Sequence, residues 1–192
     1  SLHIAEGSKV LDMACGWGPF LNYIKNERGA ETTGLTLSQG QAQACQKNGL
    51  NVLVKDCRYI TPSDFGQFDA VTCIGGMEHF CSIEEWQAGK QEKIYNDFFK
   101  MIYELLPVGG RFYMQTMVFS KNMIPFEEID INAKKGSTSH VLALMIEEFP
   151  GSWLPYGPEM VIRNAEPLFK LISKSSGRLD YIETIEKKKK KF

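Results

Sequence analysis

The sequence lacks the features that define several common classes of protein. Its five cysteines form no CxxC pair and no zinc-ligand spacing, so neither a zinc site nor a redox motif is indicated. The formal net charge of −1 provides no general attraction for nucleic acid. No apolar run approaches membrane-spanning length, and no secretory signal precedes the first predicted strand. We therefore expect a reduced, cytoplasmic protein without metal ions and without a nucleic-acid partner.

The remaining composition is that of an ordinary globular protein. Hydrophobic residues make up 43% of the 192 residues and charged residues make up 23%. This length suffices for one domain with a sizeable core, and no internal repeat divides it. We expect residues 1–192 to form a single domain.

Short apolar runs alternate with amphipathic segments over the first two thirds of the chain. This alternation predicts a parallel sheet whose strands are joined by right-handed helical crossovers. The predicted strands are residues 9–14, 30–37, 51–55, 68–74 and 111–119, and the predicted helices are residues 19–28, 39–47 and 91–106.

The pattern changes after residue 119. Residues 120–158 contain four prolines and one helical piece, residues 139–149. A long excursion after the core strands usually forms a lid or a substrate-specificity insertion. A further helix is predicted at residues 159–171, and residues 179–185 suit either a strand or the start of a helix.

The stretch from Val10 to Gly18 organises the predicted sheet. It begins as an apolar run with Asp12 inside it and continues into small residues. Small residues where a strand turns into a helix let a ligand approach the backbone, and the helix start adds unpaired N–H groups. The stretch therefore indicates a site for a nucleotide-like cofactor. On these residues alone, a tight structural turn is an alternative interpretation.

Three further polar loops follow predicted strands. They are Gly34–Ser38 with Gln41 on the next helix, Asp56–Arg58, and Gly75–Phe80. In a doubly wound sheet such loops converge on one crevice. Together with the first loop they suit an adenosyl ligand, because Asp56 can accept a hydrogen bond from an adenine amino group. Glu78 and His79 would lie at the reacting end.

These segments, in this order, resemble the cyclopropane-fatty-acid synthase family, which includes the mycolic acid cyclopropane synthases. Phe149–Pro155 and Tyr181–Ile185 are similar to later segments of that family, so the resemblance covers nearly the whole chain. It implies an α/β, Rossmann-like class I methyltransferase fold. The implied sheet is mostly parallel and doubly wound, with a helical lid insertion over about residues 120–158.

The resemblance implies S-adenosylmethionine as cofactor and S-adenosylhomocysteine as its product. The implied cofactor-binding residues lie in the loops that follow the first four strands. They are Asp12, Ala14, Cys15, Gly16, Gly18, Thr36, Leu37, Gln41, Asp56, Cys57, Arg58 and Gly75.

The resemblance also implies a catalytic site. Glu78 matches a glutamate that helps to hold bicarbonate, which serves the family as general base, and Gly75 matches a backbone contact to that ion. Tyr181 matches a tyrosine beside it, and Gln115 stands where many members carry a histidine. Since this chemistry runs through the glutamate, we expect His79 to be structural.

The chain departs from the family pattern in several places. Ala14 stands where the family usually has glycine, and a methyl group there narrows the cofactor loop. The family's N-terminal segment, which bears a cysteine, and its last helices have no counterpart in the sequence. We therefore expect part of the cofactor cover and of the ion site to be absent from this chain.

The resemblance implies methyl transfer to an unsaturated lipid acyl chain, as methylation or cyclopropanation. Two alternatives are a small-molecule N-methyltransferase, which the neutral Gln115 favours, and a catalytically silent protein that binds the cofactor. Apolar residues of the insertion would wall a dry acceptor pocket. They are Met123, Ile124, Phe126, Leu142, Leu144, Met145, Ile146 and Trp153.

Five consecutive lysines, Lys187–Lys191, come just before the last residue of the sequence. Such a run is either a solvated tail or a peripheral contact with anionic lipid headgroups, which attract each nearby lysine by about 1 kcal/mol. The expected partner is thus a small-molecule or lipid acceptor, with the membrane surface as a second expectation.

Overall fold

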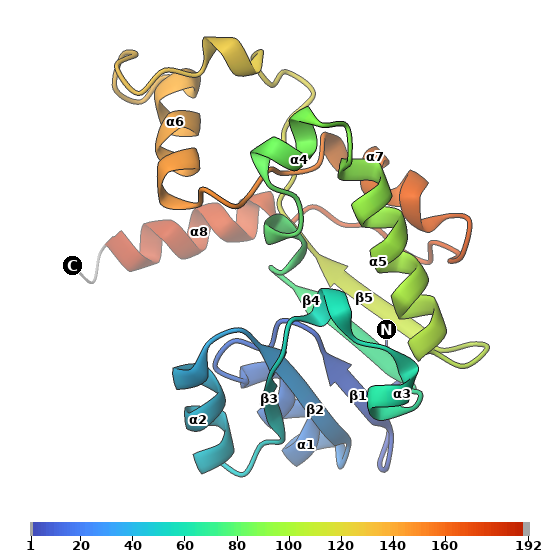
Figure 1. Ribbon diagram of the computed structural model, residues 1–192. Coiled ribbons are helices and arrows are strands. Elements are labelled where there is room, and N and C mark those ends of the chain that lie inside the picture. Colours follow the sequence, from blue (N-terminus) through green and yellow to red (C-terminus); the bar gives the residue numbers. More distant parts are fainter. Residues whose placement is uncertain (1, 190–192) are drawn as a thin grey trace.

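A five-stranded parallel sheet forms the centre of the computed structural model, which describes residues 2–189 (Figure 1). Its strand order is β3-β2-β1-β4-β5, and every neighbouring pair runs parallel. The order reverses between β1 and β4, as in a doubly wound sheet. The strands are β1 (Lys9–Asp12), β2 (Glu31–Thr36), β3 (Val52–Val54), β4 (Ala70–Ile74) and β5 (Arg111–Gln115).

Helices cover both faces of this sheet, so the predicted α/β class and double winding are confirmed. The α-helices are α1 (Pro19–Arg28), α2 (Gln39–Lys47), α3 (Pro62–Phe65), α4 (Ile83–Gln87), α5 (Gln91–Leu105), α6 (Thr138–Glu148), α7 (Gly157–Ala165) and α8 (Arg178–Lys189). Short 3-10 helices are η1 (Cys57–Tyr59), η2 (Met77–His79) and η3 (Phe126–Glu128).

The first two helices begin and end as the sequence predicts. Pro19 occupies the first turn of α1, where its missing N–H costs nothing, and Gly29 ends the helix in a left-handed conformation. Ser38 caps α2, because its side chain accepts a hydrogen bond from the Gln41 N–H. Capping chemistry local to each helix therefore fixes the loops that follow β1 and β2.

Consecutive residues of β1 enter different clusters of the core. Val10 packs in a small cluster with Ile24 of α1, whereas Leu11 belongs to the largest cluster, with Phe98 and Ile102 of α5. Both β1 residues have no exposed surface. Burying a side chain of this size contributes about 1.5–3 kcal/mol, so the strand that leads into the first loop is firmly held.

The strand β5 ends at Gln115, four residues before the predicted end. Phe119 instead forms an isolated bridge with Tyr156, and the chain between them makes a separate lobe (Figure 1). We call residues 116–156 the lid, residues 116–119 its outgoing limb and residues 152–155 its return limb.

A small core lies around Phe119, Trp153 and Leu154 of the lid, and Ile83 and Trp86 of α4 pack against it. This packing departs from the expectation that eight apolar residues wall a pocket, because six of them pack into this core and Leu144 is exposed. The six are Met123, Phe126, Leu142, Met145, Ile146 and Trp153.

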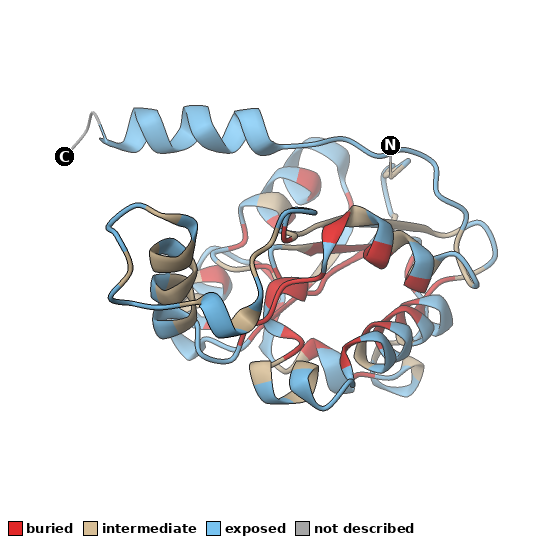
Figure 2. Cartoon of the chain, turned by 90° about the horizontal axis from the view of Figure 1, so that it is seen from above, coloured by how far each residue is buried: buried red, intermediate tan, exposed pale blue. Residues whose placement is uncertain are grey.

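The last two helices differ from the predicted segments. Instead of spanning residues 159–171, α7 begins at Gly157 and ends at Ala165, because Pro167 cannot continue a helix. The segment predicted as strand or helix is the helix α8, and none of its described residues is buried (Figure 2). Lys187, Lys188 and Lys189 lie on α8; Lys190 and Lys191 fall outside the described residues.

Neither a membrane-spanning helix nor a cluster of metal ligands is found in the described part of the chain. No helix in it is long and apolar enough to cross a membrane. Within residues 2–189, no group of three or more His, Cys, Asp and Glu side chains could hold a metal ion.

Candidate functional site

The loops after β1 and β4 lie against each other at the carboxyl edge of the sheet, at the point where the strand order reverses. A Cβ atom added to Gly76 would stand 2.9 Å from the Cβ of Ala14. Ala14, the residue that departs from the family pattern, thus keeps its methyl group because its neighbour across the crevice is glycine. The edge where these loops meet is the expected place for a ligand.

Asp12 lies at the end of β1 with 2% of its surface exposed. Burial raises the pKa of its carboxyl from 3.8 to about 6, although hydrogen bonds from the Ala14 N–H and the Thr72 hydroxyl oppose the rise. Its Oδ1 accepts from the Ala14 N–H at 3.4 Å. A carboxylate kept in so dry a place indicates a function, since an apolar residue would be more stable there.

Two glycines shape the first loop. Gly18 has φ +76, and a Cβ there would stand 2.7 Å from Leu50 Cδ1, so the turn is packed tightly against the core. Gly16 has φ +54, and nothing lies within 4 Å of the place its Cβ would take. The loop is therefore closed on its inner side and open at Gly16, where a ligand can reach the backbone.

The thiols of Cys15 and Cys45 support this loop from beneath. Both donate to the carbonyl of Gly16, with sulfur–oxygen distances of 3.8 Å and 3.7 Å. Burial raises the pKa of Cys15 to about 12, so its thiol stays neutral. Cys15 thus supports the loop and is unsuited to act as a nucleophile.

The second loop presents polar groups from Thr36 and Gln41. The Thr36 hydroxyl donates to Gln41 Oε1 at 2.6 Å and accepts from the Ser38 N–H at 3.1 Å. Leu37, between them, is 72% exposed. The two polar side chains are thereby oriented as a pair at the end of β2, beside the first loop.

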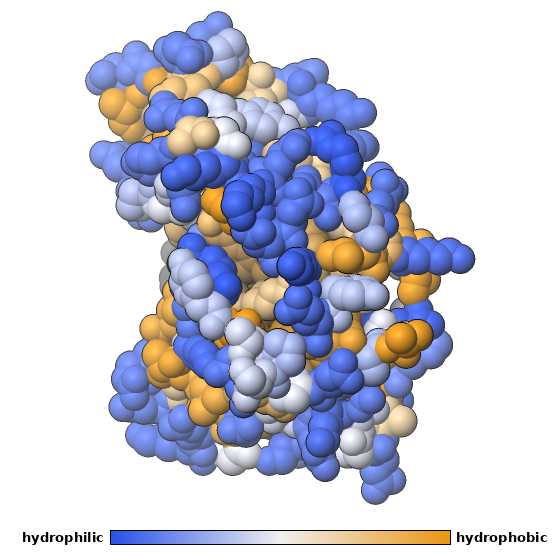
Figure 3. Space-filling view, turned by 45° about the vertical axis from the view of Figure 1, so that its right-hand side comes forward, coloured by the Kyte–Doolittle hydropathy of each residue, from blue (hydrophilic) through white to orange (hydrophobic). Residues whose placement is uncertain are grey.

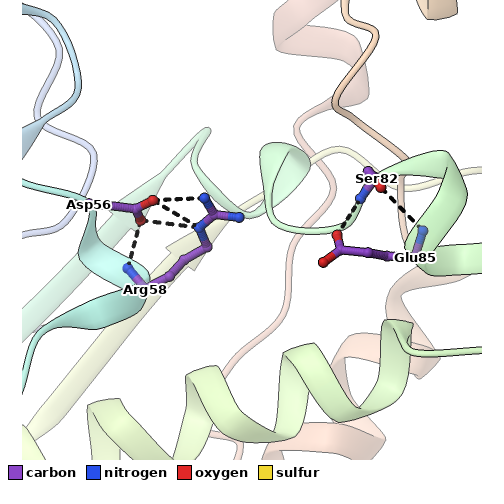
Figure 4. A network of polar contacts seen from close by, with 4 residues as sticks. All are labelled: Asp56, Arg58, Ser82 and Glu85. Carbon is purple, nitrogen blue, oxygen red and sulfur yellow. Dashed lines mark hydrogen bonds and ion pairs between the residues drawn. The ribbon is translucent and has the colours of Figure 1, made fainter.

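The third loop is organised by an ion pair. Arg58 donates from its backbone N–H and its guanidinium to Asp56, the closest contact being 2.7 Å from Nη2 to Oδ2 (Figure 4). The guanidinium holds the pKa of the Asp56 carboxyl below its usual range. A ligand amino group would share an Asp56 oxygen with Arg58. The buried Cys57 lies between them.

Glu78 is the most unusual side chain of the site. It lies in η2 just after β4, with 4% of its surface exposed. Its Oε1 accepts from the Met117 N–H at 2.8 Å. Its Oε2 is also buried and has no hydrogen-bond partner among the described residues. A buried carboxylate oxygen without a partner costs about 1–3 kcal/mol or more, which points to a ligand or substrate as its natural partner.

The other two predicted catalytic residues contact each other near Glu78. Gln115 Nε2 donates to the Tyr181 hydroxyl at 3.1 Å, although Tyr181 lies on the exposed helix α8. The Gln115 carbonyl accepts from the Gly75 N–H at 3.0 Å. Gly75 has φ +66 and open space around its Cβ position. The structure thus brings Gly75, Gln115 and Tyr181 together at the end of β4 and β5.

Two residues close to the site were not predicted from the sequence. The Ser152 hydroxyl lies 2.7 Å from His79 Nδ1. Gln91, which is 3% exposed, donates from Nε2 to the carbonyls of Trp153 and Leu154, each at 3.2 Å. No local pattern reveals either contact, because each joins segments more than 60 residues apart.

The surface is indented between the sheet and the lid (Figure 3). Two hollows of about 280 and 570 Å³ lie instead beside the N-terminal segment, the first of them lined also by Asp69 and the turn that precedes β5. Neither contains a predicted site residue. The candidate site is therefore the open crevice at the carboxyl edge.

Comparisons with known proteins bear on the family and the fold. The sequence model of a family described as mycolic acid cyclopropane synthetase matches residues 1–192. Cyclopropane mycolic acid synthase 3 of Mycobacterium tuberculosis is 28% identical over 195 residues, which cover 96% of this chain and 62% of that protein. The chain spans about three-fifths of the length of this curated relative.

Solved structures support the fold. The cyclopropane synthase MmaA2 from Mycobacterium tuberculosis superposes with a TM-score of 0.67 at 23% identity, over 90% of this chain and 58% of that one. The mycolic acid cyclopropane synthase CmaA1, crystallised with SAH and CTAB, superposes with a TM-score of 0.64 at 23% identity over the same shares. Both likenesses confirm the Rossmann-like arrangement.

Proposed function

The chain belongs to the mycolic acid cyclopropane synthetase family, and from this premise we propose that it transfers a methyl group from S-adenosylmethionine to an unsaturated lipid acyl chain. The single observation that carries the proposal is the buried, unpartnered oxygen of Glu78 at the end of β4. A carboxylate oxygen there is placed to hold or move a proton at the reacting end of the crevice.

The residues at the carboxyl edge fit the cofactor. At the left-handed Gly16 nothing lies within 4 Å of the Cβ position, which leaves room for a ligand against the backbone. We propose that Asp12, Gly16 and Gly18 bind its aminoacyl end, and that Thr36, Leu37 and Gln41 face its ribose. Asp56, Cys57 and Arg58 would lie by the adenine. When bound, the cofactor supplies an electrophilic methyl group on a sulfonium.

The residues around Glu78 would then serve the acceptor. Glu78 is fixed by the Met117 N–H, so its free oxygen keeps one direction. Gly75, Gln115 and Tyr181 meet at the ends of β4 and β5, and we propose that they assist Glu78 in holding bicarbonate. Since Gln115 is neutral, we expect this ion to bind more weakly than where a histidine adds a donor or a charge.

The exposed apolar side chains of the lid favour a lipid as the acceptor. The limbs of the lid join the body beside Glu78, and apolar side chains such as Met117 and Phe149 are about half exposed there. Closing apolar surface over the crevice would exclude water while Glu78 aligns with the acceptor. Contact of the lysines of α8 with anionic headgroups is part of the same proposal.

A second candidate is a small-molecule N-methyltransferase. The observation that favours it is the neutral Gln115, which is already paired with Tyr181. An amine can lose its proton to water, whereas the carbocation left when an alkene is methylated must lose a proton from one particular carbon to a base held beside it, so an amine acceptor depends less on a positioned general base.

The experiment incubates the purified protein with methyl-labelled S-adenosylmethionine and either a total lipid extract or a set of small amines. Label in the lipid fraction supports the proposal, and label in the amines alone supports the second candidate. Transfer to neither, together with calorimetric binding of S-adenosylhomocysteine, would identify a silent binding protein. Absence of any binding would refute the cofactor assignment.

A further inference from the structure

Two consecutive residues hold the two limbs of the lid. Glu78 accepts from the N–H of Met117 on the outgoing limb at 2.8 Å. His79 places Nδ1 2.7 Å from the hydroxyl of Ser152 on the return limb. Both residues lie in the same short turn, η2, which the His79 N–H closes by donating to the Gly76 carbonyl. The turn at the reacting end is thus also the attachment point of the lid.

The return limb has two further attachments, of a different kind. The backbone N–H of Trp153 donates to the Cys81 carbonyl at 2.7 Å, and Gln91 Nε2 donates to the backbone carbonyls of Trp153 and Leu154. These bonds hold backbone groups of buried residues, so we regard them as part of the stable fold of the protein. The bond between His79 and Ser152 joins two side chains, and His79 is exposed.

The imidazole of His79 makes a second contact with the lid. Its ring centroid lies 6.1 Å from that of Phe149, which is 54% exposed just before the return limb. His79 therefore contacts the lid on both sides of Gly151. A side chain with these two contacts can set the position of the return limb without belonging to the core.

We propose that His79 is a positioning residue, which fixes the return limb of the lid next to Glu78 through Ser152. The lid contacts follow from the geometry alone, whereas the effect on acceptor binding rests on the proposed function. The two limbs bond to each other where the Phe119 N–H donates to the Pro155 carbonyl at 2.9 Å, and Glu78 and His79 fix both of them to η2. Loss of the His79 contact should therefore shift the return limb and weaken binding of the acceptor rather than of the cofactor.

The experiment compares four variants with the natural protein. His79→Ala and Ser152→Ala each remove one partner, the double variant removes both, and His79→Asn keeps a polar atom near the place of Nδ1. His140→Ala is the matched control, because His140 Nδ1 makes a similar exposed contact, 2.8 Å from the Ile131 carbonyl, wholly inside the lid.

The first readout is amide hydrogen exchange at residues 151–154, which needs no substrate. His79→Ala and Ser152→Ala should each speed exchange there by about twofold to tenfold, the value of one hydrogen bond. The double variant should add little, because both changes remove the same bond. His79→Asn should restore most of the protection, and His140→Ala should leave these amides unchanged.

The second readout separates binding of the two ligands. Affinity for S-adenosylhomocysteine should stay within about twofold of the natural value in every variant, because the side-chain contacts of His79 are with Ser152 and Phe149 of the lid. The KM for a labelled lipid acceptor should rise more than kcat falls in His79→Ala, and His79→Asn should reverse this.

Unchanged exchange at residues 151–154 in His79→Ala and Ser152→Ala would overturn the proposal, as would fully additive effects in the double variant. If the natural protein transfers no label to lipid, the proposed function fails but the exchange data still decide whether His79 holds the lid. A changed acceptor KM without rescue by asparagine would also refute a positioning role.

Discussion

The sheet and the lid are built on different principles, although they meet at one turn. Strands β1 and β4 are buried almost throughout. Because these strands are held in the core, the loops that follow them are held in place as well. The lid encloses only a small aromatic core, and its helix α6 has no buried residue among those described (Figure 2). The crevice edge is therefore shaped by the main core, whereas the acceptor side belongs to a lobe built around a smaller cluster that it shares with α4.

We therefore expect a substitution in one half of the site to leave the other half unchanged. The cofactor loops are fixed by backbone bonds such as that from the Cys15 N–H to the Leu35 carbonyl at 3.0 Å. The lid is joined to the body by the contacts of Glu78 and His79, by hydrogen bonds of its return limb to Cys81 and Gln91, and by the stacking of Trp153 on Trp86 of α4. Damage to the lid core should therefore leave cofactor binding intact, and changes in the first loop should leave the lid intact.

The largest effect is expected from Trp153→Ala. Trp153 has no exposed surface and stacks on Trp86 with ring centroids 4.4 Å apart. Removing a buried aromatic ring costs about 3–5 kcal/mol. Hydrogen exchange should show α6 and the return limb opening, while calorimetry shows nearly unchanged affinity for S-adenosylhomocysteine.

Trp17→Ala is the control for this change, because Trp17 lies in the first loop with 67% of its surface exposed. It should leave the lid amides unchanged. If Trp153→Ala abolished cofactor binding as well, the two halves would be one cooperative unit and the comparison would fail.

A smaller effect on stability, in the stabilising direction, is expected from Asp12→Asn at pH 7. The pKa of Asp12 is raised from 3.8 to about 6, so the folded state binds its proton more tightly than the unfolded state does. This group therefore stabilises the fold at low pH, and that stabilisation is lost as the pH rises from about 4 to 6. The asparagine variant should lack this loss and be more stable at pH 7 by up to about 3 kcal/mol, while binding the cofactor poorly.

Urea unfolding at several pH values measures this effect, and Asp56→Asn provides the contrast. The pKa of Asp56 is lowered by Arg58, so its contribution is present above pH 4 and is lost as the pH falls. Its removal should slightly reduce stability at pH 7, because the pair is partly exposed. If Asp12→Asn were also destabilised at pH 7, burial would not be the dominant influence on Asp12.

The sequence predicted the sheet half of the fold much better than the rest. The bounds of α1 and α2 match because Pro19, Ser38 and similar capping residues act locally. The strand β5 is shorter than predicted because Glu78 takes the N–H of Met117, a contact over 39 residues that no periodicity reveals. Pro167 ends α7. The apolar spacing of residues 159–171 predicts a longer helix, although this proline is a local signal against it.

The residues of the site also divide into those that the sequence predicted and those that it could not predict. Resemblance and strand ends placed Asp12, Thr36 and Glu78 in loops that the structure brings to one edge. The contacts of His79 with Ser152 and of Gln91 with the return limb depend on how the lid folds back. The sequence could not predict them, because polar residues that bond across a fold look locally like ordinary surface residues.

In the proposed function, Glu78 serves the reaction from a place set by the outgoing limb and does not bind the cofactor. The measurement is turnover and cofactor affinity of Glu78→Gln, which keeps the shape of the side chain but removes its charge. We expect turnover with the labelled lipid acceptor to fall by roughly a hundredfold or more, with affinity for S-adenosylhomocysteine within about twofold of the natural value. Near-normal turnover, or a loss of cofactor affinity that matches the loss of turnover, would contradict the account.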